Sequence, residues 1–338
     1  MPGSARTIPH RILVTGSRGK SSLARLVHAA FRAAGKTARA RITGVLPREL
    51  GADGTERVIR RTSPAHIGEI RWWLDQVPRG TDALIVENSA VAPDLQGVVA
   101  SWVHPTLTVW TTLRPDHTDV WGPGIEGAAH ALLRGVPAGG LVAAGGETDR
   151  PDLAELFRRN GNTVHFDHPP PGCSHREANL SLALLAMALC LPHADMPGIR
   201  PVLAALPPDV ADFRILARGA GDGDSLAVAF SANDTESTER LFMETGWHPG
   251  ETTLLYHHRP DRGARLHAFL PWIASRRWKE TVFSRSGGRF SLAPGRGIAW
   301  NDGLDGPESF RRWWAGRGKV FACGNVAGWP LAFLRELP

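Results

Sequence analysis

Short runs of apolar residues alternate along the chain with longer segments in which apolar residues recur every three to four positions. In the first part of the chain, the apolar runs predict buried strands near residues 11–15, 83–87, 106–111, 139–143 and 163–166. The segments of helical periodicity predict helices near residues 20–34, 94–101, 124–134, 151–160 and 177–191. Strands and helices that alternate in this order predict a mostly parallel sheet covered by helices.

A proline pair interrupts this series at Pro207-Pro208-Asp209. Beyond it, a second alternation predicts strands near 213–217, 226–231, 252–256, 280–283 and 319–322 and helices near 235–246, 262–275 and 327–336. Residues 286–306 are rich in Gly, Ser and Asp and predict a long surface loop. Because 338 residues exceed what one hydrophobic core usually supports, we expect two α/β domains, residues 1–212 and a smaller, Rossmann-like domain of residues 213–338.

The strongest chemical signal is a glycine-rich loop between the first predicted strand and the first predicted helix, Gly16-Ser17-Arg18-Gly19-Lys20-Ser21-Ser22. Glycines permit a tight turn in which backbone N–H groups point at phosphate oxygens, Lys20 adds a positive charge, and the Ser21 hydroxyl can bind Mg²⁺. The loop is two residues shorter than the usual Gly-x4-Gly-Lys-Ser/Thr pattern. An ordinary turn with an incidental lysine is the alternative, and the correctly placed strand and helix favour the phosphate loop.

Two further groups of polar residues follow apolar strands. Glu87 ends the run Leu84-Ile85-Val86, and Asp116, His117 and Asp119 come shortly after a strand near 106–111. Ligands of open α/β sheets bind at the carboxyl ends of the strands, so Glu87 and His117 are expected to meet Ser21 there and to hold magnesium. Asp and His are also common in turns, which is the alternative for the second group.

Composition and charge exclude several classes of protein. The chain has a net charge of +6, but its basic residues are scattered, so nucleic-acid binding ranks last among the functions considered. Three widely spaced cysteines, Cys173, Cys190 and Cys323, favour neither disulfides nor a zinc site, and we expect them to be reduced and mostly packed. No apolar run long enough to span a membrane and no secretory signal occur, which predicts a cytoplasmic protein.

Taken together, these motifs resemble the central ATPase domain of the Mur ligases and folylpolyglutamate synthases. The resemblance is closer still to the ligase subunit of poly-γ-glutamate synthase, and it covers nearly the whole chain. The stretches that carry it are Arg41 to Arg48, Asp53 to Glu56, Arg60-Arg61, Glu87 to Pro93, Asp116 to Gly122, Glu177 to Asn179, Phe213-Arg214, Ser231 to Thr238, His258 to Arg262 and Cys323 to Gly328.

The resemblance implies an ATP- and Mg²⁺-dependent enzyme that transfers the γ-phosphate to a substrate carboxylate and lets an amine attack the acyl-phosphate, inside a cleft that closes between two domains. By position it assigns the phosphates to Lys20 and the amides of Gly16 to Ser22, one magnesium ion to Ser21 and Glu87, and a second to His117. It further implies that Asn179 contacts the base and Arg214 the phosphates. Asp234 is expected either to cap a helix or to contact the nucleotide.

The resemblance also suggests small amino-acid substrates, with glutamate or a glutamate-like amino acid as the carboxylate donor. The candidates for contacting them are Thr43, Arg48, Arg60, Arg61, Arg259 and Arg262. In a chain this rich in arginine, an ordinary surface role is the equal alternative for each arginine. The acceptor amine, the product length and the oligomeric state, including a homo-oligomer, stay open.

Some features depart from the family. No lysine lies between Lys36 and Lys279, so the carbamylated lysine of many Mur ligases has no counterpart here. Thr112 stands where the family often has an asparagine, and Asn88-Ser89 stands where the poly-γ-glutamate ligases tend to have Cys-Met. The apolar segment that commonly begins poly-γ-glutamate ligase subunits is missing, which favours a soluble enzyme that makes a small amide or short peptide. Two other functions therefore stay open, a phosphate-loop kinase or ATPase that does not ligate, and an inactive nucleotide-binding scaffold.

Overall fold

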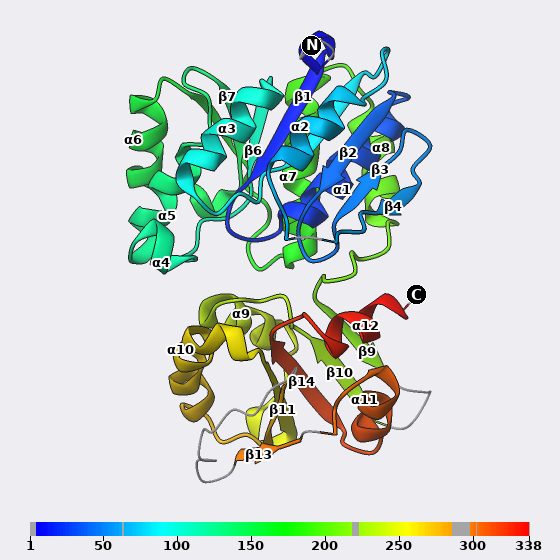
Figure 1. Cartoon of the computed structure of the whole chain (residues 1–338), viewed down its shortest axis with the longest axis vertical. Helices are drawn as coiled ribbons and strands as arrows, with labels where there is room; N and C mark the ends of the chain where they lie inside the picture. The colour runs from blue at the N-terminus through cyan, green and yellow to red at the C-terminus, as the bar shows by residue number, and fades with distance from the viewer. Residues whose placement is uncertain (1–4, 63, 218–222, 286–297, 302, 338) are drawn as a thin grey trace. The chain divides into compact units, whose positions relative to one another are not determined.

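The structure, a computed structural model, describes residues 5–62, 64–217, 223–285, 298–301 and 303–337. The chain divides into two compact units, Met1–Pro207 and Pro208–Pro338 (Figure 1). The boundary thus precedes the expected one after residue 212. The reason is local, because Val210 packs against the hydrophobic core of the second unit and Asp209 and Asp212 hydrogen bond to each other.

The sheet of the first unit has eight strands in the order β4-β3-β2-β5-β1-β6-β7-β8. The neighbouring pairs from β2 to β8 are parallel, and β3 and β4 add an antiparallel edge. This arrangement confirms the mostly parallel sheet. The strands are β1 His10–Thr15, β2 Ala38–Ile42, β3 Arg48–Leu50, β4 Glu56–Val58, β5 Ala83–Glu87, β6 Leu107–Trp110, β7 Leu141–Ala144 and β8 Thr163–Phe166.

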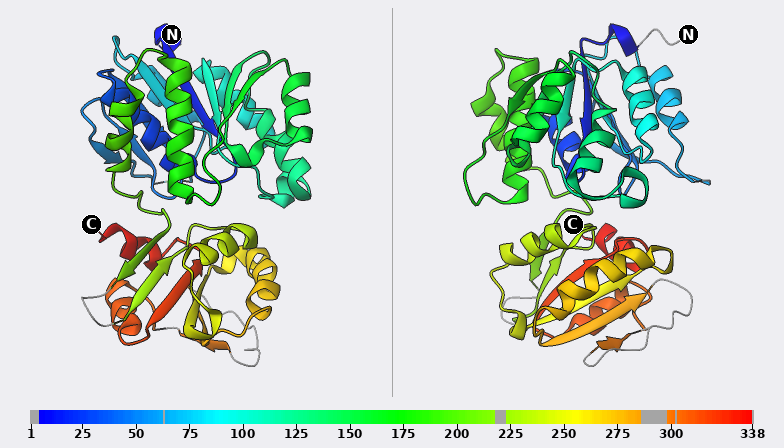
Figure 2. Two further views of the ribbon diagram at one scale, coloured as in Figure 1. Left: turned by 180° about the vertical axis from the view of Figure 1, so that it is seen from behind. Right: turned by 90° about the vertical axis from the view of Figure 1, so that its left-hand side faces the viewer.

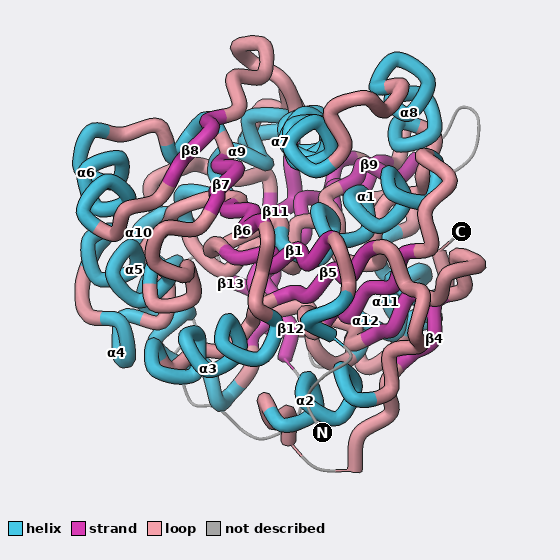
Figure 3. The backbone as a smooth tube through the Cα atoms, turned by 90° about the horizontal axis from the view of Figure 1, so that it is seen from above, coloured by secondary structure: helices cyan, strands magenta, loops and turns pink. Residues whose placement is uncertain are grey.

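Helices cover both faces of this sheet (Figures 2 and 3). Alternate residues of β1 point to opposite sides, since Ile12 and Val14 pack with α1, α7 and α8, whereas Leu13 packs with α2 and α3. The helices are α1 Lys20–Ala33, α2 Gly68–Asp75, α3 Pro93–Val103, α4 Thr118–Trp121, α5 Gly124–Leu133, α6 Pro151–Arg159, α7 His175–Cys190 and α8 Met196–Ala204, with short 3-10 helices η1 Ala5–Thr7 and η2 Gly146–Thr148.

The register of the central strands brings the predicted motifs to one edge. Val14 of β1 pairs with Glu87 of β5, and Thr15 pairs with Trp110 of β6. Because these strands are parallel neighbours, the residues that follow them leave the sheet at the same end.

The second unit has a sheet of six strands in the order β13-β12-β11-β14-β10-β9, parallel except for the edge strand β9. Helices α9 and α10 pack on one face, and α11 and α12 pack on the other. The expected smaller α/β domain is confirmed. Its elements are β9 Arg214–Ala217, β10 Ser225–Val228, α9 Thr235–Glu244, η3 Pro249–Glu251, β11 Thr252–His258, η4 Pro260–Arg262, α10 Gly263–Ala274, β12 Glu280–Arg285, β13 Ile298–Trp300, α11 Pro307–Trp314, β14 Lys319–Gly324 and α12 Trp329–Arg335.

Several elements escaped the sequence prediction because their apolar signal is weak. Strand β2 carries arginines at alternate positions, and the guanidinium of Arg41 is buried between Glu49 and Glu69 instead of facing water. Helix α8 contains Pro201 in its interior, where a proline normally argues against a helix. The loop predicted for 286–306 is wrong at Ile298–Trp300, which forms β13; residues 286–297 and 302 lie outside the described part.

Most of the packing expectations hold. Trp73 and Trp314 are buried in hydrophobic clusters, whereas Trp72 is 64% exposed. All three cysteines are free thiols, with Cys323 buried and Cys173 and Cys190 partly buried. None of the helices in the described part of the chain is both long and apolar enough to cross a bilayer.

Candidate functional site

The phosphate-binding loop takes its shape from two glycines with positive φ. Gly16 has φ 121°, and a Cβ on it would lie 2.2 Å from Oγ1 of Thr111. Gly19 has φ 79° and is the N-cap of α1, so no side chain caps the first turn of that helix. The amide groups at this helix start thus form an anion-binding arrangement of the kind the sequence predicts.

The segment after β6 holds the loop in place. The backbone N–H of Ser17 donates to the carbonyl of Thr112 at 3.0 Å, and the N–H of Arg18 donates to Oγ1 of Thr112 at 2.9 Å. In turn, the N–H of Arg114 donates to Oγ of Ser17 at 2.7 Å. These roles of Thr112 and Arg114 could not be predicted, because contacts between residues more than ninety positions apart leave no local signal in the sequence.

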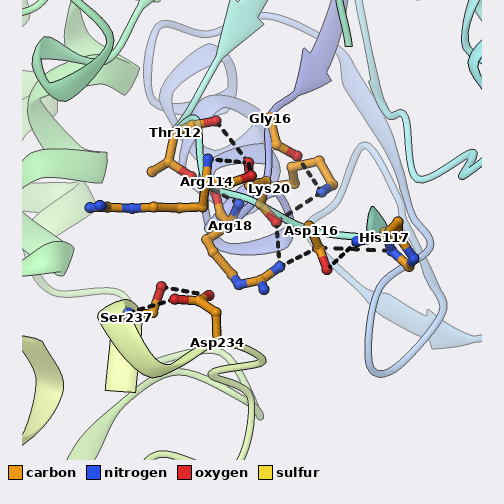
Figure 4. Close-up of polar contacts among 10 residues, drawn as sticks. Gly16, Arg18, Lys20, Thr112, Arg114, Asp116, His117, Asp234 and Ser237 are labelled. Carbon is orange, nitrogen blue, oxygen red and sulfur yellow. Dashed lines mark hydrogen bonds and ion pairs between the residues drawn. The ribbon is translucent and has the colours of Figure 1, made fainter. Parts of the chain in front are cut away.

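Lys20 folds back over its own loop. Its ammonium donates to the carbonyls of Gly16 at 2.6 Å and Ser17 at 3.4 Å (Figure 4). Burial lowers the pKa of Lys20, and the nearby carboxylates of Glu87 and Asp116 act in the opposite direction. The positive charge of Lys20 therefore interacts with the carboxylates of both Glu87 and Asp116.

Glu87 is the centre of a small polar cluster at the end of β5. It is 2% exposed, and its Oε2 accepts hydrogen bonds from the Ser21 hydroxyl at 3.1 Å and from the N–H groups of Thr43 and Gly44 at 2.8 and 3.2 Å. Thr43 also shares a hydroxyl hydrogen bond of 2.6 Å with Ser89. The structure thus brings together Ser21, Glu87 and Thr43, three residues singled out from the sequence.

Gly44 is a site residue to which sequence analysis gave no role. A Cβ there would lie 2.4 Å from Oγ of Ser21 and 3.3 Å from Oε1 of Glu87. Since the contact involves the oxygens of the expected metal ligands, only glycine leaves them room. No local signal marked Gly44, because strand β2 before it carries arginines at alternate positions and the role of the glycine depends on Ser21 and Glu87.

Asp116 and His117 form a second polar cluster, which is attached to the loop by Arg18. The Arg18 guanidinium donates to Oδ2 of Asp116 at 2.6 Å (Figure 4). Burial opposes ionisation of Asp116, but Arg18 and His117 outweigh it and hold the pKa of that carboxyl below its usual value. His117 adopts φ 44°, a left-handed conformation that is strained for a residue with a side chain, and its ring packs edge-on against Trp121 at 5.1 Å.

Two other predicted nucleotide contacts lie in the first unit at the start of helices. Asn179 of α7 lies next to the loop, because a Cβ on Gly19 would be 3.2 Å from its side-chain amide. Helix α7 begins with a capping box in which Ser174 and Glu177 hydrogen bond reciprocally, which fixes the first turn, just before Asn179. Ser22 lies in the first turn of α1.

The arginines expected to bind substrate in the first unit differ in their surroundings. Arg48 donates to Glu56 at 2.6 Å, and Arg61 contacts both carboxylate oxygens of Glu69 at 2.9 Å, so each already binds an internal carboxylate. Arg60 is exposed. A substrate would have to compete with Glu56 or Glu69 for the first two arginines.

The remaining predicted residues lie in the second unit. Asp234 caps α9, since its Oδ1 accepts the N–H of Ser237 at 2.7 Å, so the expected cap is confirmed, and its contact with the nucleotide stays a prediction (Figure 4). Arg214 is the first residue of β9. Its Nη2 donates to the carbonyl of Val210 at 3.3 Å, and its buried Nε has no hydrogen-bond partner among the described residues. Arg259 and Arg262 both face Asp261, at 2.6 and 4.0 Å.

The residues around Ser21 fit a divalent cation of the kind expected. Hydroxyl and carboxylate oxygens are the ligands that Mg²⁺ prefers, and they meet at a position that Gly44 keeps clear of a Cβ. Within the described ranges, no group of three or more His, Cys, Asp or Glu side chains is arranged to hold a metal ion, so Glu87 and His117 do not form such a group with a third residue. The fit is therefore that of an ion held by few protein ligands, which leaves positions for phosphate oxygens.

Comparison with known protein families agrees with this geometry. Residues 14–143 match the Mur ligase middle domain, and residues 216–338 match the C-terminal domain of poly-gamma-glutamate synthase CapB. Two segments that together make up most of the chain are therefore similar to the middle domain of the Mur ligases and to the C-terminal domain of a poly-gamma-glutamate synthase. The matched Mur ligase segment contains the phosphate loop, Gly44, Glu87 and His117, so the polar clusters described above lie within the family's middle domain.

Two known proteins are similar over most of this chain. PGA synthase CapB of Bacillus subtilis (strain 168) is 27% identical over 292 residues, which cover 79% of this chain and 72% of that protein. Capsule biosynthesis protein CapB of Bacillus anthracis is 28% identical over 303 residues, covering 79% of this chain and 62% of that protein. The chain therefore spans less than two thirds of the second relative.

Solved structures with the Mur ligase fold include two folylpolyglutamate synthases. FolC of E. coli in complex with DHPP and ADP matches with a TM-score of 0.67 at 16% sequence identity. The match covers 99% of this chain and 90% of the FolC chain. A second match is the bifunctional folylpolyglutamate synthase/dihydrofolate synthase of Yersinia pestis, complexed with AMPPNP and a Mn ion. It has a TM-score of 0.66 at 14% sequence identity, and the match covers 96% of this chain and 88% of that chain. At these identities the likeness establishes the fold.

Proposed function

We propose that this protein is an ATP-dependent, ADP-forming ligase that joins a carboxylate to an amine through an acyl-phosphate, with glutamate or a glutamate-like amino acid as a substrate. The observation that carries the proposal is the contact of Ser21 with Glu87 beside Gly44, at the carboxyl edge of the sheet and next to the phosphate loop. It supports a cation site beside the position proposed for the phosphate oxygens. The CapB relatives, and the nucleotide complexes of proteins with this fold, also support an ATP-dependent ligase.

The nucleotide would be held by the loop. The amides of Gly16 to Ser22 and the uncapped start of α1 would bind the phosphates, and Lys20 would exchange its internal carbonyl contacts for phosphate oxygens. Asn179 would contact the base, and we keep Arg214 and Asp234 as proposed contacts from the second unit.

Mg²⁺ is the proposed cation, with Ser21 and Glu87 as its ligands and His117 proposed for a second ion. When bound, it would neutralise negative charge on the phosphates. Glu87 would be kept in position by the N–H groups of Thr43 and Gly44, which both donate to its Oε2. These backbone contacts make the orientation of the carboxylate independent of the cation.

The chemistry balances in two steps. A carboxylate oxygen of the substrate attacks the γ-phosphorus of ATP while the bond between that phosphorus and the β,γ-bridging oxygen breaks, which gives an acyl-phosphate and ADP. The amine nitrogen of the acceptor then attacks the acyl carbon, phosphate leaves with the former carboxylate oxygen, and the nitrogen loses a proton to solvent. Lys20 and the loop amides would stabilise the charge that develops on the phosphate oxygens.

Transfer of an oxygen atom tests this sequence directly. The purified protein is incubated with ATP, Mg²⁺ and amino acids labelled with ¹⁸O in their carboxylates, singly and in pairs, and ADP, phosphate and amide are followed by mass spectrometry. The expected result is ADP release that requires both a carboxylate and an amine, an amide product, and one ¹⁸O atom in the released phosphate. Lys20→Ala is expected to abolish turnover, whereas Lys36→Ala, with the same loss of charge outside the loop, is expected to retain it.

Other outcomes separate the alternatives. A phosphorylated product formed without any amine would identify a kinase. Phosphate release with no ¹⁸O would exclude the acyl-phosphate. Tight ATP binding without turnover by any pair of substrates would indicate a scaffold protein.

A further inference from the structure

A basic cavity lies in the second unit, away from the carboxyl ends of its parallel strands. Its volume is about 500 Å³. Thr253, Lys279 and Glu280 line it from the amino-terminal ends of β11 and β12, and α11 and the loop before β14 complete it with Arg312, Trp313 and residues 315–317. It belongs to neither polar cluster of the first unit.

The charges around this cavity are unbalanced. Lys279, Arg312 and Arg317 are cationic, and Glu280 is the one carboxylate among the lining residues. Glu280 is already ion-paired with Arg317. Arg312 makes no ion pair or hydrogen bond with any residue in the described ranges, so its positive charge is left available.

A buried hydroxyl adds an independent indication of a ligand. Thr253 is 1% exposed, so its Oγ1 lies beneath the surface of the cavity, and this hydroxyl has no hydrogen-bond partner among the residues that the structure describes. A buried polar group without a partner costs free energy unless a ligand or water satisfies it. A basic wall and an unsatisfied donor in one cavity are the features expected of an anion site.

The walls of the cavity are fixed by internal contacts. The Arg317 guanidinium lies 4.4 Å from the centre of the Trp313 ring, and its Nε donates to the carbonyl of Trp313 at 2.8 Å. Asp224 accepts the N–H groups of Gly316 and Gly318, both at 2.7 Å, which holds the loop between α11 and β14. An anion would therefore bind to a preformed arrangement.

We propose that the cavity of Thr253, Lys279, Arg312 and Arg317 is a second anion-binding site, which takes a small oxyanion, either a phosphate or the carboxylates of an amino acid or short glutamyl chain. Lys279 and Arg312 would supply the charge, and Trp313 would contact the apolar part of the ligand. The proposal is separate from the ligase reaction and does not depend on it.

Fluorine NMR of the full chain labelled with 5-fluorotryptophan tests the site. The resonance of Trp313, one of twelve tryptophans, is assigned by its loss in Trp313→Phe. Inorganic phosphate, L-glutamate and tri-γ-glutamate are titrated separately, which distinguishes the two sources of oxyanion. We expect saturable movement of the Trp313 signal with at least one of them, weakened about tenfold or more by Arg312→Gln.

The matched control is Arg277→Gln, which removes the same charge from an exposed arginine that does not line the cavity. It is expected to leave the titration unchanged. No movement of the Trp313 signal with any of the three anions would overturn the proposal. The proposal would also be overturned if Arg312→Gln bound the anions as tightly as the parent protein, or if Arg312→Gln and Arg277→Gln weakened binding equally. Lys20→Ala is expected to retain the response, so failure of the ligase proposal would leave this result intact.

Discussion

The hydroxyl of Ser21 donates a hydrogen bond of 3.1 Å to Oε2 of Glu87, although the two residues lie 66 positions apart. One follows a strand at the start of a helix, and the other ends the neighbouring strand of the same sheet. Their contact defines the proposed cation site, and it makes the following variants informative.

Glu87→Gln is expected to weaken the cation site while retaining the fold. The amide keeps the size of the side chain but removes the negative charge that a divalent cation requires. We expect the Mg²⁺ concentration for half-maximal turnover to rise by about 10- to 100-fold, measured as ADP release against Mg²⁺. Glu49→Gln, which neutralises a carboxylate bound to Arg41 instead, serves as control; equal effects in the two variants would contradict the assignment.

Gly44→Ala is expected to abolish turnover with little loss of stability. Its Cβ would lie 2.4 Å from Oγ of Ser21, so the hydroxyl must move away from Glu87. The control is Gly263→Ala, where a Cβ meets nothing within 4 Å and the helix is expected to gain about 0.5–1 kcal/mol. Thermal unfolding and ADP release measured on both proteins decide the question, and full activity of Gly44→Ala would refute the proposed cation position.

The Arg18 and Asp116 pair is expected to stabilise the first unit only when Asp116 is ionised. Its pKa is lowered in the folded state, so the contribution is fully present above the ordinary pKa near 3.8 and is lost as the pH falls through the lower folded value. A double-mutant cycle with Arg18→Ala and Asp116→Asn, followed by urea unfolding, should give a coupling on the order of 1 kcal/mol at pH 7. That coupling should decrease below about pH 4; a coupling that does not depend on pH would contradict the ion pair.

His257 is expected to make the second unit sensitive to acid. The ring is fully buried, its Nδ1 lies 2.9 Å from Oγ of Ser284, and burial lowers its pKa to about 4. Between pH 6.5 and 4 the unfolded chain binds a proton at this histidine that the folded chain does not bind. The free energy of unfolding therefore decreases by about 3 kcal/mol as the pH is lowered from 6.5 to 4. In His257→Gln this part of the pH dependence should disappear from urea unfolding curves. The exposed His267→Gln should behave as the parent protein does, and an unchanged slope in His257→Gln would show that another group is responsible.

Local patterns of sequence determined the principal elements and the main candidates for the site. The alternation of apolar runs with helical periodicity predicted both α/β units, because strands and helices of a parallel sheet must each bury an apolar face. The phosphate loop and Glu87 could be found as well, since each directly follows an apolar strand whose carboxyl end is the place where ligands bind.

Only the tertiary structure decided which distant groups meet. Strand β2 was missed because Arg41 is buried by pairing with Glu49 and Glu69, a stabilisation that no apolar pattern records. The hold of Thr112 on the phosphate loop, the room that Gly44 leaves beside Ser21, and the unsatisfied hydroxyl of Thr253 likewise depend on segments far apart in the chain. These contacts depend on the register of the strands, and strands buried on both faces of a parallel sheet are continuous apolar runs that do not specify their register.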